Sequence, residues 1–550
     1  MGISILVKVP LVIILVTLGS LLWKIRPFIL GQFTSPFLRI RGPRSSSWLF
    51  GQHKERHESG DDYAYDRWFE EYGPLVMIRG FFNMPRLLTS DTRVINHVLT
   101  HSADYQKPEQ ARRTLARLLG DGVLITEGDT HRQQRRIMNP AFGPSQIREL
   151  TEIFVEKAVE LRDVWMKEIS DSSDKGDSAR INVMRGLSKM TLDVIGLAGF
   201  NYEFHALNPT GEPNELAKAF EDIFVTPDKI PVLRIMRNFF PILDLIKTEE
   251  SRRIDEALAV MSRIGSQLIA EKKAEILRQS SEKGDGLGRK SLQGRDLLTL
   301  LIRANMATDI PENQRLSDED VLAQVPTFLV AGHETTSTAT TWCLYALTQA
   351  PNVQQKLREE LLSMGTDNPT MDELMALPYL DMVVRESLRV YAPVPETVRV
   401  AKKEDVIPLE KPFTDKDGQT HSSIKIAPGS SIVIPIKTLN RSKEIWGEDA
   451  HEFRPERWED PPEAVSSIPG VWGHMLTFLG GPRACIGYRF SLVEMKALIY
   501  TLVRAFEFEL AVSPSDIKLV PGIVERPRLR SEPSQGNQMP LIVRKYNDRA

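Results

Sequence analysis

Cys485 is the residue of this chain whose surroundings point most directly to chemistry. It lies in the segment FLGGPRACIGYRF, residues 478–490, and is one of only two cysteines among 550 residues. Gly481 and Gly487 allow a tight backbone on either side of it, and Arg483 places a fixed positive charge two positions before the sulfur. A neighbouring cation favours the thiolate, which can act as a nucleophile or as a metal ligand.

The cysteine count leaves two alternatives for that thiolate. The other cysteine, Cys343 in TWCLYAL, is interpreted as a small buried apolar residue, and no CxxC pair is present to build a zinc or iron–sulfur site. A single thiolate suits a metal that brings its other ligands with it, and haem does so because the porphyrin leaves one proximal position for the protein. The alternative is a nucleophilic cysteine, which needs a histidine base; the chain has ten histidines, none of them in this segment.

A second motif, AGHETTS, combines an acid with a hydroxyl. Ala331 and Gly332 are small enough to leave space beside a helix, and Glu334 followed by Thr335 would stand at that gap. An acid and an alcohol placed in this way can pass protons into a pocket that is otherwise kept dry, as oxygen activation requires. The alternative is a threonine-rich helix with an exposed glutamate.

Two further motifs carry charge in a pattern that favours a structural role. In ESLR, Glu386 and Arg389 share a helix face, and such pairs usually do no more than form a salt bridge in solvent. In FRPERW, Arg457 lies in a coil that contains a proline. We predict that Arg457 completes a charged triad with Glu386 and Arg389, and that this triad locks the coil that carries the cysteine loop.

These four motifs occur in one chain, with AGxET, ExxR and PERW preceding the pattern FxxGxRxCxG. That last pattern is matched at Phe478, Gly481, Arg483, Cys485 and Gly487. In these motifs and in their order the chain resembles the cytochrome P450 superfamily of haem-thiolate monooxygenases. The resemblance covers essentially everything after about residue 60.

The resemblance implies a fold and a cofactor. The expected fold is mostly α-helical with small β regions, the cytochrome P450 fold. Haem b would be held between the helix of residues 318–349 and the helix that begins after Cys485, whose sulfur would be the axial ligand of the iron. By the same resemblance Glu334 and Thr335 would be the catalytic acid and alcohol.

The resemblance also implies further residues that contact the cofactor. EGDTHRQQRRIMNPAF is similar to the family's helix on which a tryptophan, and an arginine four residues later, contact a haem propionate; the positions here are His131 and Arg135. Arg399 in PVPETVRVA and Arg483 would be further cations, and Phe478 is assigned to the same site. Since a carboxylate would raise the pKa of His131 while burial would lower it, the residue could be a cation whose hold on haem weakens as pH climbs, or neutral.

The same resemblance implies an enzyme that inserts one oxygen atom from O2 into an apolar organic substrate. Electrons would come from NADPH through a separate cytochrome P450 reductase, with cytochrome b5 as a further candidate partner, because no dinucleotide or flavin fingerprint is present. Segments such as PTFLVAGHETTS are similar to fungal microsomal members, many of which oxidise terpenoids or other secondary metabolites. A haem-thiolate isomerase or dehydratase that needs no reductase, and a non-catalytic haem sensor, are the alternatives.

The substrate pocket is expected, by the resemblance alone, in segments spread along the chain. They are residues 105–125, residues 224–243, the helix face before Thr335, and residues 394–398.

The first residues are predicted to anchor the protein in a membrane. Ile3 to Trp23 has about the 20 mostly apolar residues that a membrane-spanning helix needs. The basic residues that follow keep the body in the cytosol by the positive-inside rule: Lys24, Arg26, Arg39, Arg41 and Arg44. A cleaved signal peptide is the alternative, against which the lack of a clear cleavage site counts. With the resemblance, this predicts a single-pass protein of the endoplasmic reticulum membrane whose catalytic domain faces the cytosol.

The rest of the chain is predicted to be one large catalytic unit. The expected parts are an anchor over residues 1–26, a proline-containing hinge over 27–60 and the catalytic domain over 61–550. With 70 basic and 73 acidic residues, the chain has no excess charge that would indicate nucleic-acid binding. Apolar spacing predicts helices over residues 146–169, 181–197, 252–277 and 318–349, a hairpin of residues 75–80 and 86–90, and a polar surface loop over 279–294.

Overall fold

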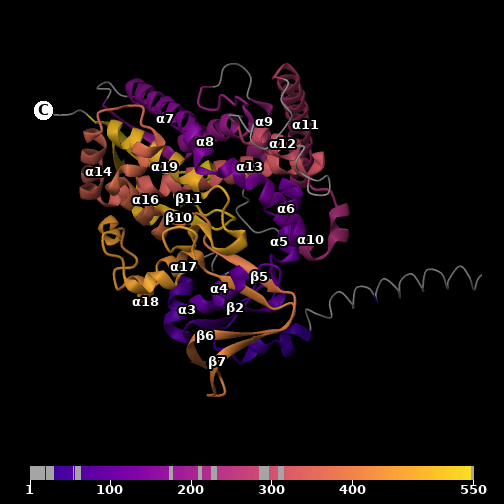
Figure 1. The fold of residues 1–550 in the computed structure, drawn as a ribbon. Coiled ribbons are helices and arrows are strands. Elements are labelled where there is room, and N and C mark those ends of the chain that lie inside the picture. Colours follow the sequence, from indigo (N-terminus) through magenta and orange to yellow (C-terminus); the bar gives the residue numbers. More distant parts are fainter. Residues whose placement is uncertain are drawn as a thin grey trace, which may run out of the picture. The chain divides into compact units, whose positions relative to one another are not determined.

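The computed structural model describes residues 19, 30–53, 55, 63–172, 177–208, 214–223, 232–283, 296–306 and 315–546. These residues form two compact units, shown in Figure 1. The first unit combines Met1–Gln106 with Glu396–Thr438, and the second combines Lys107–Pro395 with Leu439–Ala550. Each unit is therefore built from segments that are far apart in the sequence.

The first unit is built around a mixed sheet of five strands. The strands lie in the order β1 (Leu75–Arg79), β2 (Pro85–Thr89), β8 (Ser431–Ile434), β5 (Thr397–Ala401) and β3 (Tyr105–Gln106). Only β2 and β8 run parallel; β1 and β2 form the antiparallel hairpin that the sequence predicts. Trp68, on helix α3 (Ala64–Tyr72), packs with apolar side chains of this sheet such as Val76 and Val433, which excludes water from one face.

The remaining elements of the first unit are short. They are α4 (Thr92–Thr100), the 3₁₀ helices η1 (Pro36–Arg39) and η2 (Phe81–Asn83), and the hairpin of β6 (Asp405–Thr414) and β7 (Thr420–Ile426). Helix α4 begins after Asp91 because that carboxylate accepts a hydrogen bond from the backbone N–H of Val94 (3.0 Å).

The second unit is mostly helical. Its helices are α5 (Glu109–Leu119), α6 (Gly128–Met138), α7 (Pro144–Ser172), α8 (Val183–Phe200), α9 (Glu215–Ile223), α10 (Val232–Phe239), α11 (Glu249–Lys283), α12 (Leu297–Met306), α13 (Asp318–Gln349), α14 (Pro351–Ser363), α15 (Met371–Ala376), α16 (Pro378–Val390), α18 (Lys443–Trp446) and α19 (Tyr488–Ala505). Helix α17 (Ile436–Asn440) crosses the boundary between the units. Its sheets are β4 (Ser178–Asn182) with β12 (Pro540–Lys545) and β9 (Phe506–Leu510), and the hairpin of β10 (Ile517–Val520) and β11 (Arg526–Leu529).

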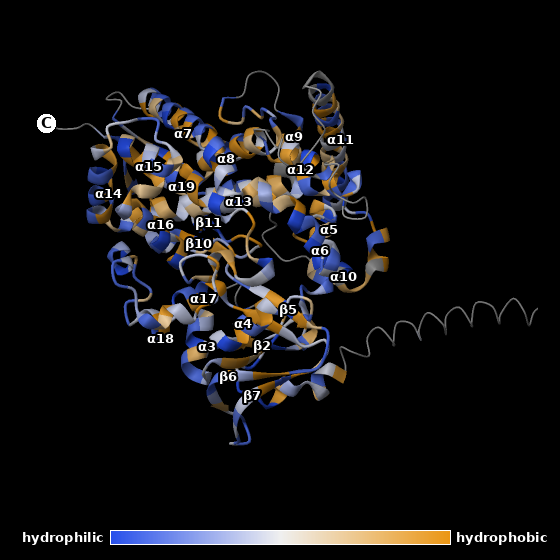
Figure 2. Ribbon diagram, in the orientation of Figure 1, coloured by the Kyte–Doolittle hydropathy of each residue, from blue (hydrophilic) through white to orange (hydrophobic). Residues whose placement is uncertain are grey.

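Helix α13 lies among the other helices of the second unit (Figure 1). It begins with a capping box, in which Ser317 and Asp320 satisfy each other's free backbone N–H groups. It packs against α8, α16 and α19, and its second half is buried on nearly every side. Outer helices such as α7 and α14 instead alternate between blue and orange in Figure 2, the pattern of amphipathic helices with one face in water.

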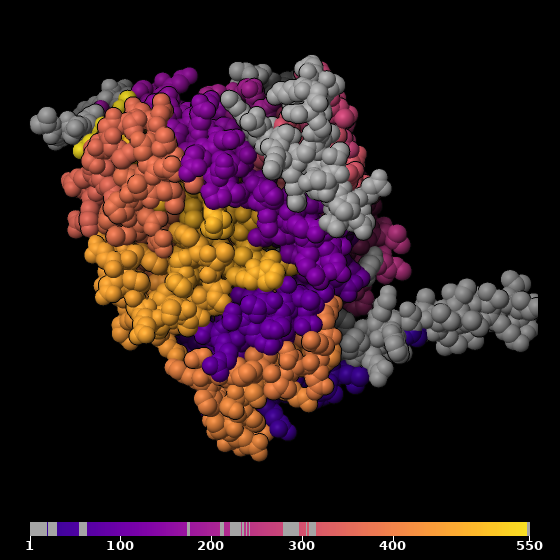
Figure 3. Space-filling model, viewed as in Figure 1, coloured from indigo at the N-terminus to yellow at the C-terminus, as the bar shows by residue number. Residues whose placement is uncertain are grey.

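Helices α7 and α19 bring early and late parts of the chain together. They contact each other, and Phe154 of α7 lies edge to face with Phe490 of α19, with ring centroids 4.7 Å apart. On the face seen in Figure 3, purple segments of the second unit lie beside its yellow C-terminal segments. The helix that follows Cys485 is thus held in the main apolar core of this unit.

The predicted fold class is confirmed as mostly helical with small sheets. The helix predicted over residues 318–349 has those bounds, and those predicted over 146–169 and 252–277 lie within α7 and α11. The start predicted at Ile181 is wrong, because Ile181 and Asn182 belong to β4 and pair with Leu541 and Pro540 of β12. The predicted loop begins too early, because α11 continues to Lys283; residues 284–295 lie outside the described part of the chain.

The predicted membrane span lies outside the described residues except for Gly19. Among the residues that the structure describes, no helix combines the length and the apolar character needed to cross a membrane.

Candidate active site

The cysteine loop has a backbone that only particular residues can adopt. Leu479 and Gly481 have positive φ values of 55° and 68°, and a Cβ added to Gly480 would overlap the carbonyl oxygen of Pro469. The loop closes where the backbone N–H of Cys485 donates a hydrogen bond to the carbonyl oxygen of Phe478 (2.9 Å). The prediction for Gly481 is therefore confirmed, whereas the tightest glycine, Gly480, was not singled out from the sequence.

Gly487 contributes to the cysteine loop through its backbone N–H group. The loop does not require a glycine at this position to avoid a clash. A Cβ there would meet Phe142 at 3.7 Å, which is an ordinary contact. Its N–H group hydrogen-bonds to the sulfur of Cys485 and so lowers the pKa of that thiol. The loop brings a donor to the sulfur, as thiolate ligands require.

Burial and charge act in opposite directions on Cys485. Cys485 is exposed by its surface area, but the atoms packed around its sulfur desolvate the thiol and raise its pKa, while the Gly487 N–H group and the guanidinium of Arg135 lower it. The cation that lowers the pKa of the thiol is thus Arg135 on α6, whereas Arg483, the cation expected from the sequence, forms its ion pair with Glu127. Neither neighbour is the histidine base that a nucleophilic cysteine needs.

Arg135 joins helix α6 to the cysteine loop. Its Nη1 donates a hydrogen bond to the carbonyl oxygen of Ala484 (2.5 Å), and its Nε donates to Oδ1 of Asn139 (3.0 Å). His131 lies one turn earlier on the same helix and is only 5% exposed. Burial, with the charges of Lys107 and Arg135, lowers the pKa of His131 to about 4. These surroundings alone favour the neutral imidazole at neutral pH, and the contact of His131 with a propionate stays a prediction.

Arg483 is buried with part of its guanidinium unsatisfied. Its Nη2 forms a close ion pair with Oε2 of Glu127, whereas its Nη1 has no hydrogen-bond partner among the described residues. Burial, with the charge of Arg112, lowers the pKa of Arg483 to about 10. A buried N–H group without a partner is costly, and a carboxylate such as a haem propionate would satisfy it. The donors in this loop therefore fit haem.

Arg399 lies on β5 of the first unit and is described within that unit. It is buried, and its Nη1 donates hydrogen bonds to Oγ1 of Thr397 (2.6 Å) and to the carbonyl oxygen of Val398 (2.9 Å). Burial lowers its pKa to about 10. Its contact with the cofactor stays a prediction.

The AGHETTS motif lies in the middle of α13 and is only partly as expected. Ala331 is exposed, but a Cβ on Gly332 would lie 2.8 Å from Cδ1 of Ile195, so this glycine lets α8 approach and leaves no free space. The hydroxyl of Thr335 donates a hydrogen bond to the carbonyl oxygen of Ala331 (2.6 Å). The acid and the alcohol thus lie beside an exposed alanine, at the start of the more deeply buried half of the helix.

Glu334 is not the exposed glutamate of the alternative interpretation. Its side chain is 12% exposed and forms a close ion pair with Arg526 of β11. Its Oε1 lies 3.8 Å from Nδ1 of His333, whose Nε2 lies 2.7 Å from the hydroxyl oxygen of Ser188. Sequence analysis did not find Arg526, because its connection to Glu334 exists only in the folded chain.

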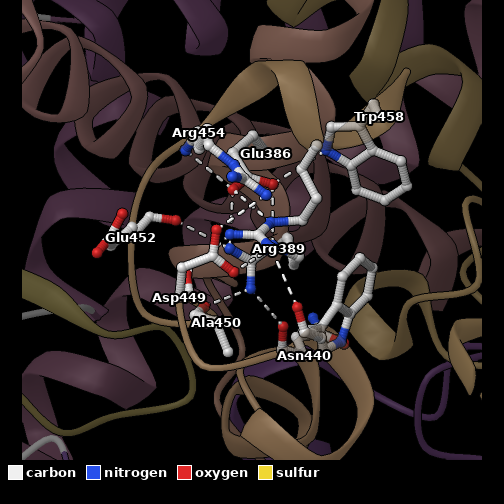
Figure 4. Close-up of polar contacts among 10 residues, drawn as sticks. Glu386, Arg389, Asn440, Asp449, Ala450, Glu452, Arg454 and Trp458 are labelled. Carbon is white, nitrogen blue, oxygen red and sulfur yellow. Dashed lines mark hydrogen bonds and ion pairs between the residues drawn. The ribbon is translucent and has the colours of Figure 1, made fainter. Parts of the chain in front are cut away.

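The charged triad predicted from ExxR and PERW is confirmed, and Figure 4 shows it. Arg389 donates from Nε to Oε2 of Glu386 (2.9 Å) and from Nη2 to Oε1 (2.8 Å), a bidentate pair that is completely buried. Arg457 donates from Nε to Oε1 of Glu386 (3.3 Å), and from Nη1 to Oδ1 of Asp449 (2.6 Å). The Nε1–H group of Trp458 donates to Oε2 of Glu386 (3.0 Å). Every oxygen of the buried carboxylate is satisfied.

This triad is connected to the cysteine loop through Asn440. Arg389 donates to the carbonyl oxygen of Asn440 (2.9 Å), and the Asn440 side chain bonds the backbone N–H of Leu476 (2.9 Å) and the hydroxyl of Thr477 (2.8 Å). Leu476 and Thr477 begin the short helix η9 (Leu476–Phe478), whose last carbonyl accepts from Cys485. The triad therefore supports the loop, as predicted.

Glu494 of α19 is a second residue that sequence analysis missed. It is completely buried, and burial raises its pKa well above the ordinary value, against the opposing effect of the Thr336 hydroxyl. The signal available in the sequence was an acid inside an apolar helix. Cys343, by contrast, is buried as predicted.

Known proteins similar to this chain come from one family. A family model described as Cytochrome P450 matches residues 41–530. Cytochrome P450 monooxygenase 205 of Postia placenta is 57% identical over 531 residues, which are 96% of this chain and 97% of that protein. Cytochrome P450 monooxygenase 128 of the same fungus is 57% identical over 529 residues, 95% of each chain. Cytochrome P450 monooxygenase claO of Ampulloclitocybe clavipes is 36% identical over 520 residues, 92% of this chain and 93% of that protein.

Proposed function

This chain belongs to the cytochrome P450 family and is a monooxygenase of that family, and from that premise we propose that it oxidises an apolar substrate of the terpenoid or a related secondary-metabolite class. Electrons come from NADPH through a separate reductase, with cytochrome b5 as a second possible donor. The observation that carries the proposal is that one compact unit holds both the thiol of Cys485 in its donor-lined loop and the Glu334–Thr335 pair beside an exposed alanine.

Haem-thiolate chemistry and the use of O2 follow from the family. When bound, haem supplies the activation of O2. Cys485 would hold the haem iron through its thiolate, which the Gly487 N–H group and the Arg135 charge would stabilise. The free Nη1 of Arg483 is suited to a propionate, and Phe478 accepts the bond that shapes the loop. His131 takes part as a neutral hydrogen-bond donor and Arg399 as a further cation.

Proton transfer is assigned to Glu334 and Thr335. Glu334 would take up a proton from water and hold it at its carboxylate, and the neighbouring Thr335 would offer a hydroxyl that can pass that proton on when haem is bound. The mostly buried position of Glu334 limits the access of bulk water. Protons would therefore pass through Glu334 and Thr335 and would not come directly from solvent. Retention of both residues argues against an isomerase or dehydratase that needs no proton supply.

The membrane anchor over residues 1–26 and the endoplasmic-reticulum location belong to this proposal. They are supported by the apolar run from Ile3 to Trp23 and by the basic residues after it.

The test is co-expression with a cytochrome P450 reductase and a panel of terpenoids, followed by product analysis. We expect a hydroxylated product that requires both NADPH and the reductase. In the same preparation, Cys485→Ser should abolish the thiolate-type Soret band of the reduced carbon monoxide complex, while Cys343→Ala, at the other cysteine, should retain it. Product formation without reductase would favour the isomerase alternative, and haem without any turnover would favour the sensor. A thiolate-type band in Cys485→Ser would overturn the ligand assignment.

A further inference from the structure

Arg526 and Glu334 form an ion pair between two elements that are separate in sequence. Glu334 lies on α13, and Arg526 is the first residue of β11. Nη2 of Arg526 contacts Oε2 of Glu334, and the two side chains are only 13% and 12% exposed. A carboxylate this deeply buried loses most of its hydration. The guanidinium of Arg526 therefore provides the charged partner that Glu334 needs.

The backbone beside Arg526 is fixed by the elements around it. The preceding residue, Glu525, donates its N–H group to the carbonyl oxygen of Pro393 (2.9 Å). The carbonyl oxygen of Glu525 accepts a hydrogen bond from Nε1 of Trp342 (3.2 Å), which lies on α13 as Glu334 does. Arg526 itself pairs with Val520 of β10. The guanidinium is therefore held at a set distance from the turn of α13 that carries Glu334.

The other side of Glu334 is also restrained. Nδ1 of His333 lies 3.8 Å from Oε1 of Glu334, while Nε2 of His333 lies 2.7 Å from the hydroxyl oxygen of Ser188. The hydroxyl of Thr191 donates to the carbonyl oxygen of His333 (3.1 Å), which further fixes this turn against α8. With one oxygen facing Arg526 and the other facing His333, the carboxylate has little freedom to choose another rotamer.

We propose that Arg526 is a positioning residue for proton delivery, a role that rests on the proposed function of Glu334. Arg526 keeps the Glu334 carboxylate oriented beside Thr335, so that this carboxylate can take a proton from water and pass it on. Arg526 does not itself exchange the proton, because a guanidinium stays protonated in proteins. The alternative is that the ion pair merely fastens the β10–β11 hairpin to α13.

Four variants of the holoenzyme separate these roles: Arg526→Gln, Arg526→Lys, Glu334→Gln and the double variant Glu334→Gln/Arg526→Gln. Arg528→Gln is the matched control, because Arg528 lies two positions along the same strand and is similarly half-buried. Product and peroxide formed per NADPH are measured with a reductase. Urea unfolding of the same proteins gives a double-mutant cycle that does not depend on activity.

If Arg526 positions Glu334, Arg526→Gln should lower product per NADPH by about tenfold and raise peroxide, as loss of an acid–base group does. Arg526→Lys should recover most of the yield because it keeps the charge. The double variant should be no worse than Glu334→Gln, because residues that act as a unit are not additive. Arg528→Gln should keep the wild-type yield, and the unfolding cycle should show coupling between positions 334 and 526.

Two results would overturn the positioning role. One is a yield in Arg526→Gln equal to that of Arg528→Gln, and the other is an additive loss in the double variant. Unfolding coupling with an unchanged product yield would leave the ion pair as a structural fastening only. Failure of the wild type to consume NADPH with a reductase is a different result, because it contradicts the proposed function itself and the positioning role with it.

Discussion

At the scale of single residues, His131 is held neutral by what surrounds it. Burial and the positive charges of Lys107 and Arg135 lower its pKa from 6.5 to about 4. Between these two values the unfolded chain binds a proton that the folded protein resists, so stability is lost as pH falls through that window and is unaffected by this residue above it. This dependence has the opposite sign from that of a cationic His131.

Replacing His131 by glutamine should therefore reduce sensitivity to acid. The wild type should lose up to about 3 kcal/mol of unfolding free energy from this residue between pH 7 and pH 4, and His131→Gln should not lose it. Urea unfolding at a series of pH values measures the difference, with haem transfer to apomyoglobin as a second readout. The interpretation would be wrong if retention of haem in the wild type instead weakened as pH rose and His131→Gln removed that effect.

Thr335 acts through a hydroxyl whose present partner is the carbonyl oxygen of Ala331, at 2.6 Å. Thr335→Ala removes that hydroxyl without changing the buried side of α13, so NADPH consumption should continue while about ten times less product forms and peroxide replaces it. Thr335→Ser is the matched control and should keep most of the product yield. Equal product per NADPH in Thr335→Ala and the wild type would remove this residue from proton delivery.

Candidate site residues could be proposed from the sequence where they belong to a short motif. The residues that contact them from distant parts of the chain could not. Cys485, Glu334 and Thr335 were found from local spacing. The partners Arg135 and Arg526 are 349 and 192 positions from the groups they bond, so no local pattern could show that one acts on the cysteine loop and the other on the acid.

At the scale of elements, the ExxR motif is a weak signal in the sequence, but its Glu386–Arg389 pair is buried and connects several elements in the fold. Such a pair contributes little in solvent, but here both side chains are fully buried and Arg389 also donates to the carbonyl oxygens of Asn440, Ala450 and Glu452. Removing Arg389 would leave the buried Glu386 carboxylate with Arg457, at 3.3 Å, as its remaining charged partner. The pair thus connects α16 to the coil before the cysteine loop.

We expect Arg389→Leu to lose about 3–5 kcal/mol of unfolding free energy and most of the bound haem, because the buried Glu386 carboxylate would lose its bidentate partner and keep only the longer ion pair with Arg457. Arg389→Lys should rescue little, since an ammonium cannot reproduce the bidentate fork. Arg385→Lys is the control on the same helix, where the ion pair with Asp381 is half-exposed and should contribute little. The measurements are the haem content per polypeptide and the midpoint of urea unfolding. If Arg389→Lys gave wild-type values for both, a bidentate guanidinium would not be required at this position.

Elements could be predicted where local signals specify their ends. Helix α13 has a capping box at Ser317, so its start was correct. The helix predicted from Ile181 began too early, because apolar spacing cannot tell that Ile181 pairs with Leu541 in a sheet. Pairing between distant strands is decided by the fold as a whole.

At the scale of the whole molecule, the described chain forms two units where the sequence indicated one catalytic domain. The first unit takes residues 396–438 from the middle of the predicted domain and joins them to the N-terminal part. The boundary predicted at residue 60 stays a prediction.

Within the predicted hinge, the described residues are partly packed. Phe37 and Ile40 are buried, and the backbone N–H of Met77 donates to the carbonyl oxygen of Arg41 (2.9 Å). Leu30 and Phe33, just before them, are 43% and 76% exposed. A protein shortened at residue 26 would therefore keep the packed residues and still present two apolar side chains that can adsorb to lipid.

Removal of residues 1–26 should move most of the protein from the membrane to the soluble fraction while the haem spectrum persists, since the motifs of the site all lie after that segment. The shortened protein with Leu30→Ser and Phe33→Ser should release the remaining membrane-bound fraction, because its exposed apolar contacts are gone. The same two substitutions in the full-length chain are the control and should leave it membrane-bound. Fractionation and the reduced carbon monoxide spectrum are measured on all four proteins. An unchanged membrane fraction after truncation would contradict the anchor, and loss of the haem spectrum would mean that the segment belongs to the fold.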